Sequence, residues 1–173
     1  MLASNELSVL QFTPIYQERI WWGRNLETLY SRRLPSPTSP YGESWEICDR
    51  PEAQSIVAGG PLEGWSLHDL WTQARNEVFG IEYSRHPAER FPLLIKILDA
   101  QEDLSMQVHP DDNSAARVGG EAKSEAWYVT ATQPGAKLYA GLKPGTEPDV
   151  FRRSMEDGTV ADHALSLTVR PGD

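Results

Sequence analysis

The sequence predicts a β-rich fold, a small barrel or sandwich with helices attached to it. Short apolar runs recur along the chain and turn residues separate them, which is typical of antiparallel β architectures. Helical periodicity is confined to two segments, and no internal repeat or low-complexity tract is present. The strands that this pattern predicts are residues 44–48, 92–98, 104–109, 126–130, 137–142 and 164–169.

The first helix is marked by local signals at both ends. Ser66 is a good N-cap, and Asp69 follows three residues later in a capping-box-like arrangement. Apolar residues then repeat at helical spacing until Gly80, which we expect to end the helix. A second, shorter helix is expected over residues 148–155.

Composition limits the classes of function. A length of 173 residues predicts a single domain over 1–173, and a formal net charge of −9 argues against a nucleic-acid-binding protein. The N-terminus lacks the features of a signal peptide, and no apolar run is long enough to cross a bilayer, so no membrane partner is expected. The one cysteine, Cys48, fits a reducing compartment, and we expect a cytoplasmic protein.

A candidate metal site lies in and after the strand predicted at residues 104–109. Gln107 and His109 are two residues apart and would share one face of that strand, while apolar side chains occupy the opposite face. Glu125 stands just before the next predicted strand and offers a carboxylate. Imidazole, carboxylate and carbonyl oxygen together suit a borderline cation such as zinc.

Each of these residues also has a plain structural interpretation. A lone histidine such as His109 is more often structural than a metal ligand, and Asp111 fits a helix cap. Lys96 interrupts an apolar run that is usually buried on both faces. It must find a carboxylate, reach a water-filled lumen, lose its charge, or extend its ammonium to solvent from a strand edge. Lys123 either shares the face of Glu125 or is a solvated turn residue.

Three other polar residues carry weaker signals. Cys48 has no histidine near it in the sequence and is expected to be a small core residue. His68 lies in the first turn of the first predicted helix and is expected to have no functional role. His163 could complete a ligand set, but nothing in its spacing singles it out.

Five motifs in order give the chain a resemblance to a known family. They are IWWG at residues 20–23, GESWEI at 42–47, FPLLIK at 91–96, QVHPD at 107–111 and KSEAWY at 123–128. Each motif is weak alone, but five in order are a strong signal, and the resemblance covers about residues 10–173. The sequence resembles the type I mannose-6-phosphate isomerases in their shorter bacterial form.

The resemblance implies a cupin-like β-barrel, or jelly roll, with a zinc ion in its lumen. Gln107, His109 and Glu125 match zinc-ligand positions of the family. Lys96 and Lys123 match lysines of the catalytic pocket, where we expect them to contact phosphate or hydroxyl groups rather than act as the base. The resemblance also places three residues near the substrate: Trp22, Glu43 and Trp45.

The activity implied is the interconversion of mannose 6-phosphate and fructose 6-phosphate through a cis-enediol. One departure from the family bears on it. In the family, the turn at residues 171–173 is followed by a further strand with a last histidine ligand, and later by an active-site arginine. We therefore expect a truncated chain with an incomplete metal shell and an unclosed barrel.

Two other functions stay open at this stage. A non-catalytic cupin-like domain that binds sugar or metal would explain the missing ligand and arginine. A non-haem iron oxygenase would use two histidines and a glutamate, but no second histidine is well placed. The oligomeric state is open.

Overall fold

The chain forms two compact units in the computed structural model, which describes residues 9–173. Unit 1 is Met1–Leu104 and unit 2 is Ser105–Asp173. Every strand pair in the described part of both units is antiparallel. This agrees with the short, turn-separated strands that the sequence predicts.

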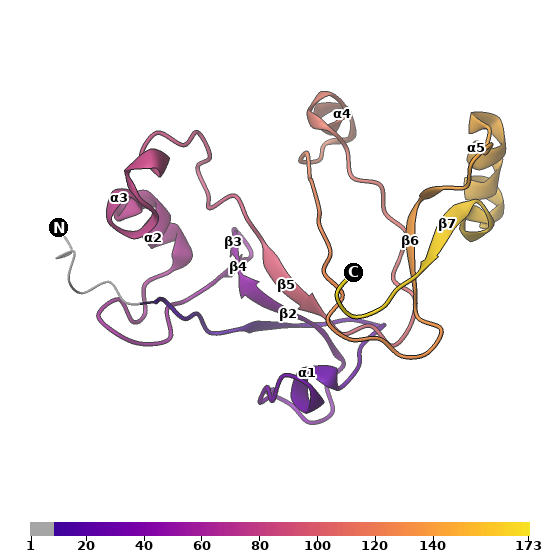
Figure 1. The fold of residues 1–173 in the computed structure, drawn as a ribbon. Helices are drawn as coiled ribbons and strands as arrows, with labels where there is room; N and C mark the ends of the chain where they lie inside the picture. Colours follow the sequence, from indigo (N-terminus) through magenta and orange to yellow (C-terminus); the bar gives the residue numbers. More distant parts are fainter. Residues whose placement is uncertain (1–8) are drawn as a thin grey trace. The chain divides into compact units, whose positions relative to one another are not determined.

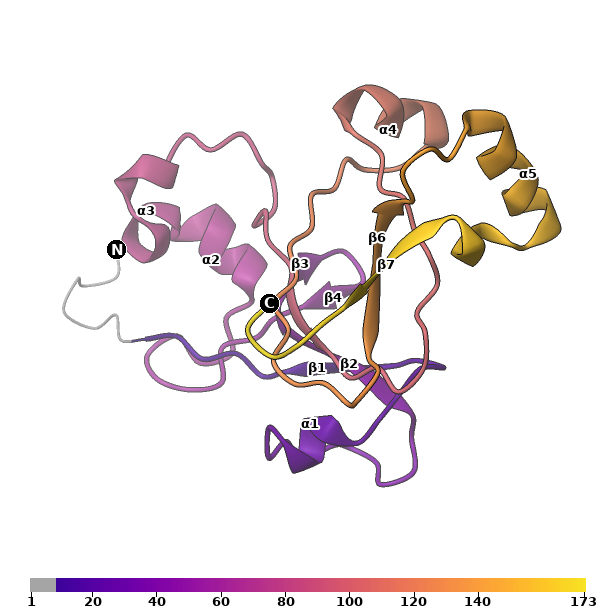
Figure 2. The same cartoon turned by 45° about the vertical axis from the view of Figure 1, so that its right-hand side comes forward.

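Unit 1 is built on a three-stranded sheet with the order β1-β2-β5 (Figures 1 and 2). The strands are β1 (Ile15–Glu18), β2 (Tyr41–Ile47) and β5 (Ile95–Leu98). The predicted strands at 44–48 and 92–98 are confirmed in position, although β2 begins three residues earlier than its prediction and β5 keeps only the last four residues of its own. A small hairpin of β3 (Asp49–Arg50) and β4 (Ala53–Gln54) follows β2.

The apolar run before Lys96 is not buried on both faces as expected. Leu93 is 57% exposed and Ile95 is 50% exposed. The strand β5 is the last strand in the sheet order, and among the described residues no further strand pairs with it. An apolar run is buried on both faces only where layers cover it, and the exposure of Leu93 and Ile95 shows that this run is not covered in that way.

The first predicted helix forms as two short helices, α2 (Leu67–Gln73) and α3 (Arg75–Phe79). The capping box of Ser66 and Asp69 is confirmed, and Gly80, with φ of 97°, ends the second helix as expected. The helix breaks at Ala74, where φ is −131° and ψ is 29°. At this break the Arg75 side chain donates from Nε to the Trp71 carbonyl at 2.8 Å, where a backbone N–H would donate in a continuous helix.

Two apolar clusters and an aromatic group form the core of unit 1. Leu26, in α1 (Asn25–Thr28), packs with Leu34 and Tyr41, and a second cluster surrounds Leu70. Trp71 is fully buried. Its ring meets those of Phe79 and Phe91 edge-on and lies near those of Tyr83, in the 3-10 helix Ile81–Tyr83, and His86.

Unit 2 contains one two-stranded sheet and two helices. The strands β6 (Lys137–Leu142) and β7 (Ala164–Thr168) pair with Leu138 opposite Leu167, which confirms both predicted strands (Figure 1). The second predicted helix is confirmed as α5 (Pro148–Asp157), and a 3-10 helix (Val160–Asp162) follows it. The helix α4 (Asp112–Val118) was not predicted, although Asp111, its N-cap, was considered as a helix cap.

Two strand predictions in this part of the chain are wrong. Residues 104–109 and 126–130 form no regular secondary structure. The alternating pattern is present, but a strand also needs a neighbour for its backbone groups. Within residues 9–173 the nearest approach to a ladder is at Val129, which donates to Asp173 O at 3.0 Å and accepts from Gly172 N at 2.8 Å. The apolar face expected for 104–109 is exposed, with Val108 at 89%.

None of the helices in the described part of the chain is long and apolar enough to span a bilayer.

Candidate functional site

The eight residues predicted from the sequence divide between the two units. Four of them belong to unit 1: Trp22, Glu43, Trp45 and Lys96. The other four belong to unit 2: Gln107, His109, Lys123 and Glu125. In each unit three of the four come together around one carboxylate.

The Glu43 cluster consists of Arg19, Glu43, Trp45 and Lys96. Glu43 and Trp45 are two residues apart on β2 and share a face, and Lys96 on β5 is paired with Trp45 in the register. The Glu43 carboxylate is buried and accepts from Trp45 Nε1 at 2.7 Å. Arg19 binds it with two hydrogen bonds, from Nε to Oε1 and from Nη2 to Oε2, both at 3.1 Å.

Lys96 is the outer member of this cluster. Its Nζ lies 3.8 Å from Glu43 Oε1, which is an ion-pair distance but too long for a hydrogen bond. Of the environments considered for this lysine, the structure provides a carboxylate partner. The lysine side chain is 24% exposed, so its ammonium is partly accessible.

Trp22 does not join the cluster and is 40% exposed. The glycine of the IWWG motif around Trp22 has a structural role, because Gly23 lies against the buried carboxylate of Asp99. A Cβ on Gly23 would collide with that carboxylate and would lie 2.8 Å from Gln101 Cγ. Asp99 accepts from the backbone N–H groups of Asn25 at 2.6 Å and Leu26 at 3.2 Å, and so caps α1.

The His109 cluster consists of His109, Lys123 and Glu125. His109 Nε2 lies 3.2 Å from Glu125 Oε2. Lys123 Nζ lies 3.2 Å from Glu125 Oε1 and 3.2 Å from His109 Nε2. The side chains are partly exposed, at 25% for His109 and 28% for Glu125.

Local structure around α4 brings this cluster together. Asp111 caps the helix through a capping box with Ser114, with Asp111 Oδ1 accepting from Ser114 N at 2.8 Å. Gly119 ends the helix with φ of 64°, and Lys123 N then donates to Pro110 O at 3.3 Å. The segment that contains α4 therefore forms a closed loop, and its closure brings Lys123 back beside His109. An open hollow of about 350 Å³ lies here, lined by His109, Pro110, Asp111, Asp112, Ala122, Lys123 and Ser124.

Glu125 is held as a carboxylate. Burial raises its pKa, but hydrogen bonds from Lys123 and Trp127, the charge of Lys123 and the contact with His109 outweigh burial. The net result is a pKa below the usual range for glutamate. An ionised carboxylate beside an imidazole is suited to a divalent cation.

The cluster brings together two of the three side chains that were expected to bind zinc, His109 and Glu125. His109 Nε2 and Glu125 Oε2 are 3.2 Å apart, a hydrogen-bond distance, and Lys123 Nζ contacts both side chains. Gln107 does not take part, since it is exposed and its Nε2 donates to Ser105 Oγ at 3.2 Å. No group of three or more His, Cys, Asp or Glu side chains in residues 9–173 is placed to hold a metal.

Comparison with known proteins places these motifs in a family. A model of the phosphomannose isomerase type I catalytic domain matches residues 9–156. The chain belongs to the type I phosphomannose isomerases. It is 36% identical over 166 residues to the mannose-6-phosphate isomerase ManA of Bacillus subtilis, covering 95% of this chain and 50% of ManA. It is 37% identical over 158 residues to a mannose-6-phosphate isomerase of Streptococcus mutans, covering 90% of this chain and 47% of that protein.

A solved structure of the same family agrees. The crystal structure of the mannose 6-phosphate isomerase from Bacillus subtilis matches with a TM-score of 0.81 and 34% identity. The match covers 95% of this chain and 50% of that protein. The chain spans about half the length of the curated relatives that it matches.

Arg19 is the member of the two clusters that sequence reasoning missed. It directly precedes the IWWG motif, so its position was a possible signal, but its partner Glu43 is 24 residues away. The other sequence expectations for polar residues hold in part. Cys48 is fully buried, as expected, and burial raises the pKa of its thiol.

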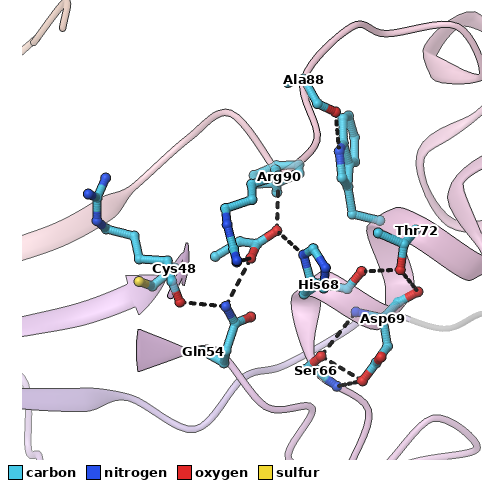
Figure 3. Close-up of polar contacts among 12 residues, drawn as sticks. Cys48, Gln54, Ser66, His68, Asp69, Thr72, Ala88 and Arg90 are labelled. Carbon is cyan, nitrogen blue, oxygen red and sulfur yellow. Dashed lines mark hydrogen bonds and ion pairs between the residues drawn. The ribbon is translucent and has the colours of Figure 1, made fainter. Parts of the chain in front are cut away.

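His68 has a polar partner, and the expectation that it has no functional role stays a prediction. Its Nδ1 lies 3.2 Å from Asp49 Oδ2 in a polar network around the buried Asp49 carboxylate in unit 1, which also contains Arg90 and Gln54 (Figure 3). Arg90 Nη1 is 2.9 Å and Phe91 N is 2.8 Å from the same carboxylate. This network ties the segment at residues 90–91 to β3 and α2, which is a structural task.

Proposed function

We propose that this protein acts in the isomerisation of mannose 6-phosphate and fructose 6-phosphate through a cis-enediol. The observation that carries the proposal is the family match over residues 9–156, together with two clusters made of the family's motif residues. The relatives named as mannose-6-phosphate isomerases are about twice as long as this chain, so the activity of the whole enzyme is a proposal here.

The reaction sets clear chemical requirements. An aldose–ketose isomerisation moves a proton between C2 and C1, and it needs a base near these carbons and a cation that stabilises the enediolate. We propose that His109 and Glu125 hold zinc, with Gln107 as a third ligand once its amide turns away from Ser105. When bound, zinc supplies Lewis acidity toward the sugar oxygens.

Side chains of both clusters have proposed roles toward the substrate. Lys96 and Lys123 contribute positive charge for the phosphate or hydroxyl groups, which a protein with a net charge of −9 must supply locally. Trp22, Glu43 and Trp45 are proposed substrate-binding residues. The carboxylate of Glu43 is buried and already accepts from Trp45 and Arg19, so its proposed contribution is to hold these side chains in place beside the substrate.

The finer fold assignment is also part of this proposal. We propose a cupin-like β-barrel, or jelly roll, organised as a single domain over residues 1–173. The antiparallel pairing of every described strand and the match to the Bacillus subtilis enzyme structure support it. The single reduced cysteine supports a cytoplasmic location, where zinc-dependent sugar metabolism would operate.

The alternative is a non-catalytic domain that binds sugar or metal. It is favoured by Gln107, which faces Ser105 and leaves only two assembled donor residues in the proposed zinc shell. The two functions differ in turnover, not in binding.

One experiment separates these functions on the 173-residue chain. Zinc content is measured after purification without added metal, and fructose 6-phosphate turnover is followed in a coupled assay with and without a chelator. Chelator-sensitive turnover supports the isomerase. Calorimetric binding of fructose 6-phosphate without turnover supports the binding domain, and absence of both binding and turnover contradicts both functions for this chain.

A further inference from the structure

Arg19 occupies both oxygens of the Glu43 carboxylate. Its Nε and Nη2 each donate at 3.1 Å, and its Nη1 donates to Glu18 O at 2.8 Å. This two-point arrangement matches the planar fork of a guanidinium to a carboxylate and fixes the orientation of both groups. Glu43 is 5% exposed at its side chain, so Arg19 also neutralises a charge that water scarcely reaches.

The chain holds the Arg19 side chain in this place. The backbone N–H of Arg19 donates to Pro40 O at 2.8 Å. Gly42 lies beneath the side chain, and a Cβ on that residue would be 2.7 Å from Arg19 Cβ. The guanidinium carbon lies 5.8 Å from the centre of the Trp21 ring, within the range of a cation–π contact.

The consequence concerns Lys96. With Arg19 and Trp45 bound, Glu43 already accepts three hydrogen bonds and carries a neutralising partner. Lys96 stays 3.8 Å away, and within residues 9–173 this ion pair is the one polar interaction that its ammonium makes. Its N–H donors therefore remain open.

We infer that Arg19 is a positioning residue that keeps Glu43 from forming a direct hydrogen bond with Lys96 and so leaves the N–H donors of the Lys96 ammonium available for an anionic group of the ligand. Without Arg19, the buried carboxylate would have Lys96 as its nearest cation. A direct hydrogen bond between them would satisfy Glu43 and occupy the lysine. The inference rests on the proposed function for the identity of the anionic group, a phosphate, but not for the effect on Lys96 itself.

The test compares three variants of the intact chain: Arg19→Met, the double variant Arg19→Met with Glu43→Gln, and Arg32→Met. Arg32 is the matched control, because it pairs with Glu46 on the same strand at 2.7 Å and does not contact Glu43 or Lys96. The first readout is the NMR signal of the Lys96 side-chain ammonium in ¹⁵N-lysine protein, assigned with Lys96→Arg. Arg19→Met should shift this signal and slow the exchange of its protons, whereas the double variant and Arg32→Met should leave it near the wild-type position.

The second readout is affinity for inorganic phosphate and fructose 6-phosphate by calorimetry. Arg19→Met should weaken phosphate binding about tenfold, the size of one charge-assisted contact, and the double variant should recover most of the loss. An unchanged Lys96 signal in a folded Arg19→Met variant overturns the inference, as does equal weakening by Arg32→Met. If wild-type protein binds neither ligand while the lysine signal shifts as expected, the proposed function fails and the role of Arg19 stands.

Discussion

The two units of this chain contain similar sequence patterns but differ in how far the patterns become structure. In unit 1 the predicted strands at 44–48 and 92–98 form within one sheet, and large apolar side chains such as Trp71 and Leu70 are fully buried. In unit 2 the strands predicted at 104–109 and 126–130 do not form, and the buried hydrophobic residues described there are two alanines, Ala115 and Ala164. An alternating pattern becomes a strand only where a neighbour completes the ladder and a layer covers the apolar face.

The carboxylates of the two units differ in the same way. Glu43, Asp49 and Asp99 in unit 1 are buried and each has several hydrogen-bond donors. Glu125 in unit 2 is partly exposed and its partners, His109 and Lys123, are themselves proposed ligand-binding groups. Unit 1 thus uses its carboxylates mainly for architecture, and unit 2 presents one near its surface.

Replacing the central aromatic residue should break the better-packed unit. Trp71→Ala removes a fully buried ring that contacts Phe79, Phe91 and Arg75, so we expect the free energy of unfolding to fall by about 3–5 kcal/mol. Trp127→Ala is the matched change in unit 2, where the ring is 48% exposed, and should cost less than about 1 kcal/mol. Chemical denaturation of both variants checks this, and similar losses would contradict the contrast between the units.

A smaller effect is expected from a single methyl group in the IWWG motif. Gly23→Ala places a Cβ against the Asp99 carboxylate that caps α1, and we expect a loss of about 1–3 kcal/mol. Gly59→Ala is the control, because a Cβ there has no heavy atom within 4 Å and Gly59 has no positive φ. Thermal unfolding measures both. A Gly23→Ala protein as stable as the control would mean that this motif residue has no packing role.

The smallest effect concerns the pH dependence of stability. Burial raises the pKa of Asp49, but hydrogen bonds from Phe91, Gln54, His68 and Arg90 outweigh it and lower the pKa below its ordinary 3.8. A lowered pKa in the folded state means stabilisation that is full above about pH 4 and is lost as the pH falls through the folded value.

Asp49→Asn tests this dependence. The stability difference between wild type and Asp49→Asn should be largest near neutral pH and shrink as the pH falls below about 4. Asp103→Asn, a change at an exposed residue, should leave the acid limb of the wild-type curve in place. A difference between wild type and Asp49→Asn that stays constant down to pH 2 would contradict the assignment.

Local signals in the sequence were sufficient for several elements. The capping box of Ser66 and Asp69 and the helix end at Gly80 depend on residues only a few positions apart. The turns that bound β6 and β7 are local signals of the same kind. His109 and Glu125 were proposed as neighbours from the residue pattern, but the loop closed by α4 brings them together, not the strand that was expected at 104–109.

The rest depended on contacts between distant residues. Arg19 binds Glu43, which is 24 positions away in the sequence, and Asp99 caps α1 from 74 positions away. Neither pairing produces a periodic pattern in the sequence. Helical spacing also does not reveal the break at Ala74, where the Arg75 side chain takes the place of a backbone donor to the Trp71 carbonyl. The failed strands show the converse, because alternation does not indicate whether a partner strand is present.

The most direct test of the proposed metal site is the zinc content of the purified 173-residue chain compared with that of a variant carrying both His109→Ala and Glu125→Gln. We predict about one zinc per wild-type chain and its loss in the variant, with Gln107→Ala giving weaker retention at the same stoichiometry. Wild-type protein that remains metal-free in excess zinc, or a double variant that keeps its zinc, would contradict the account.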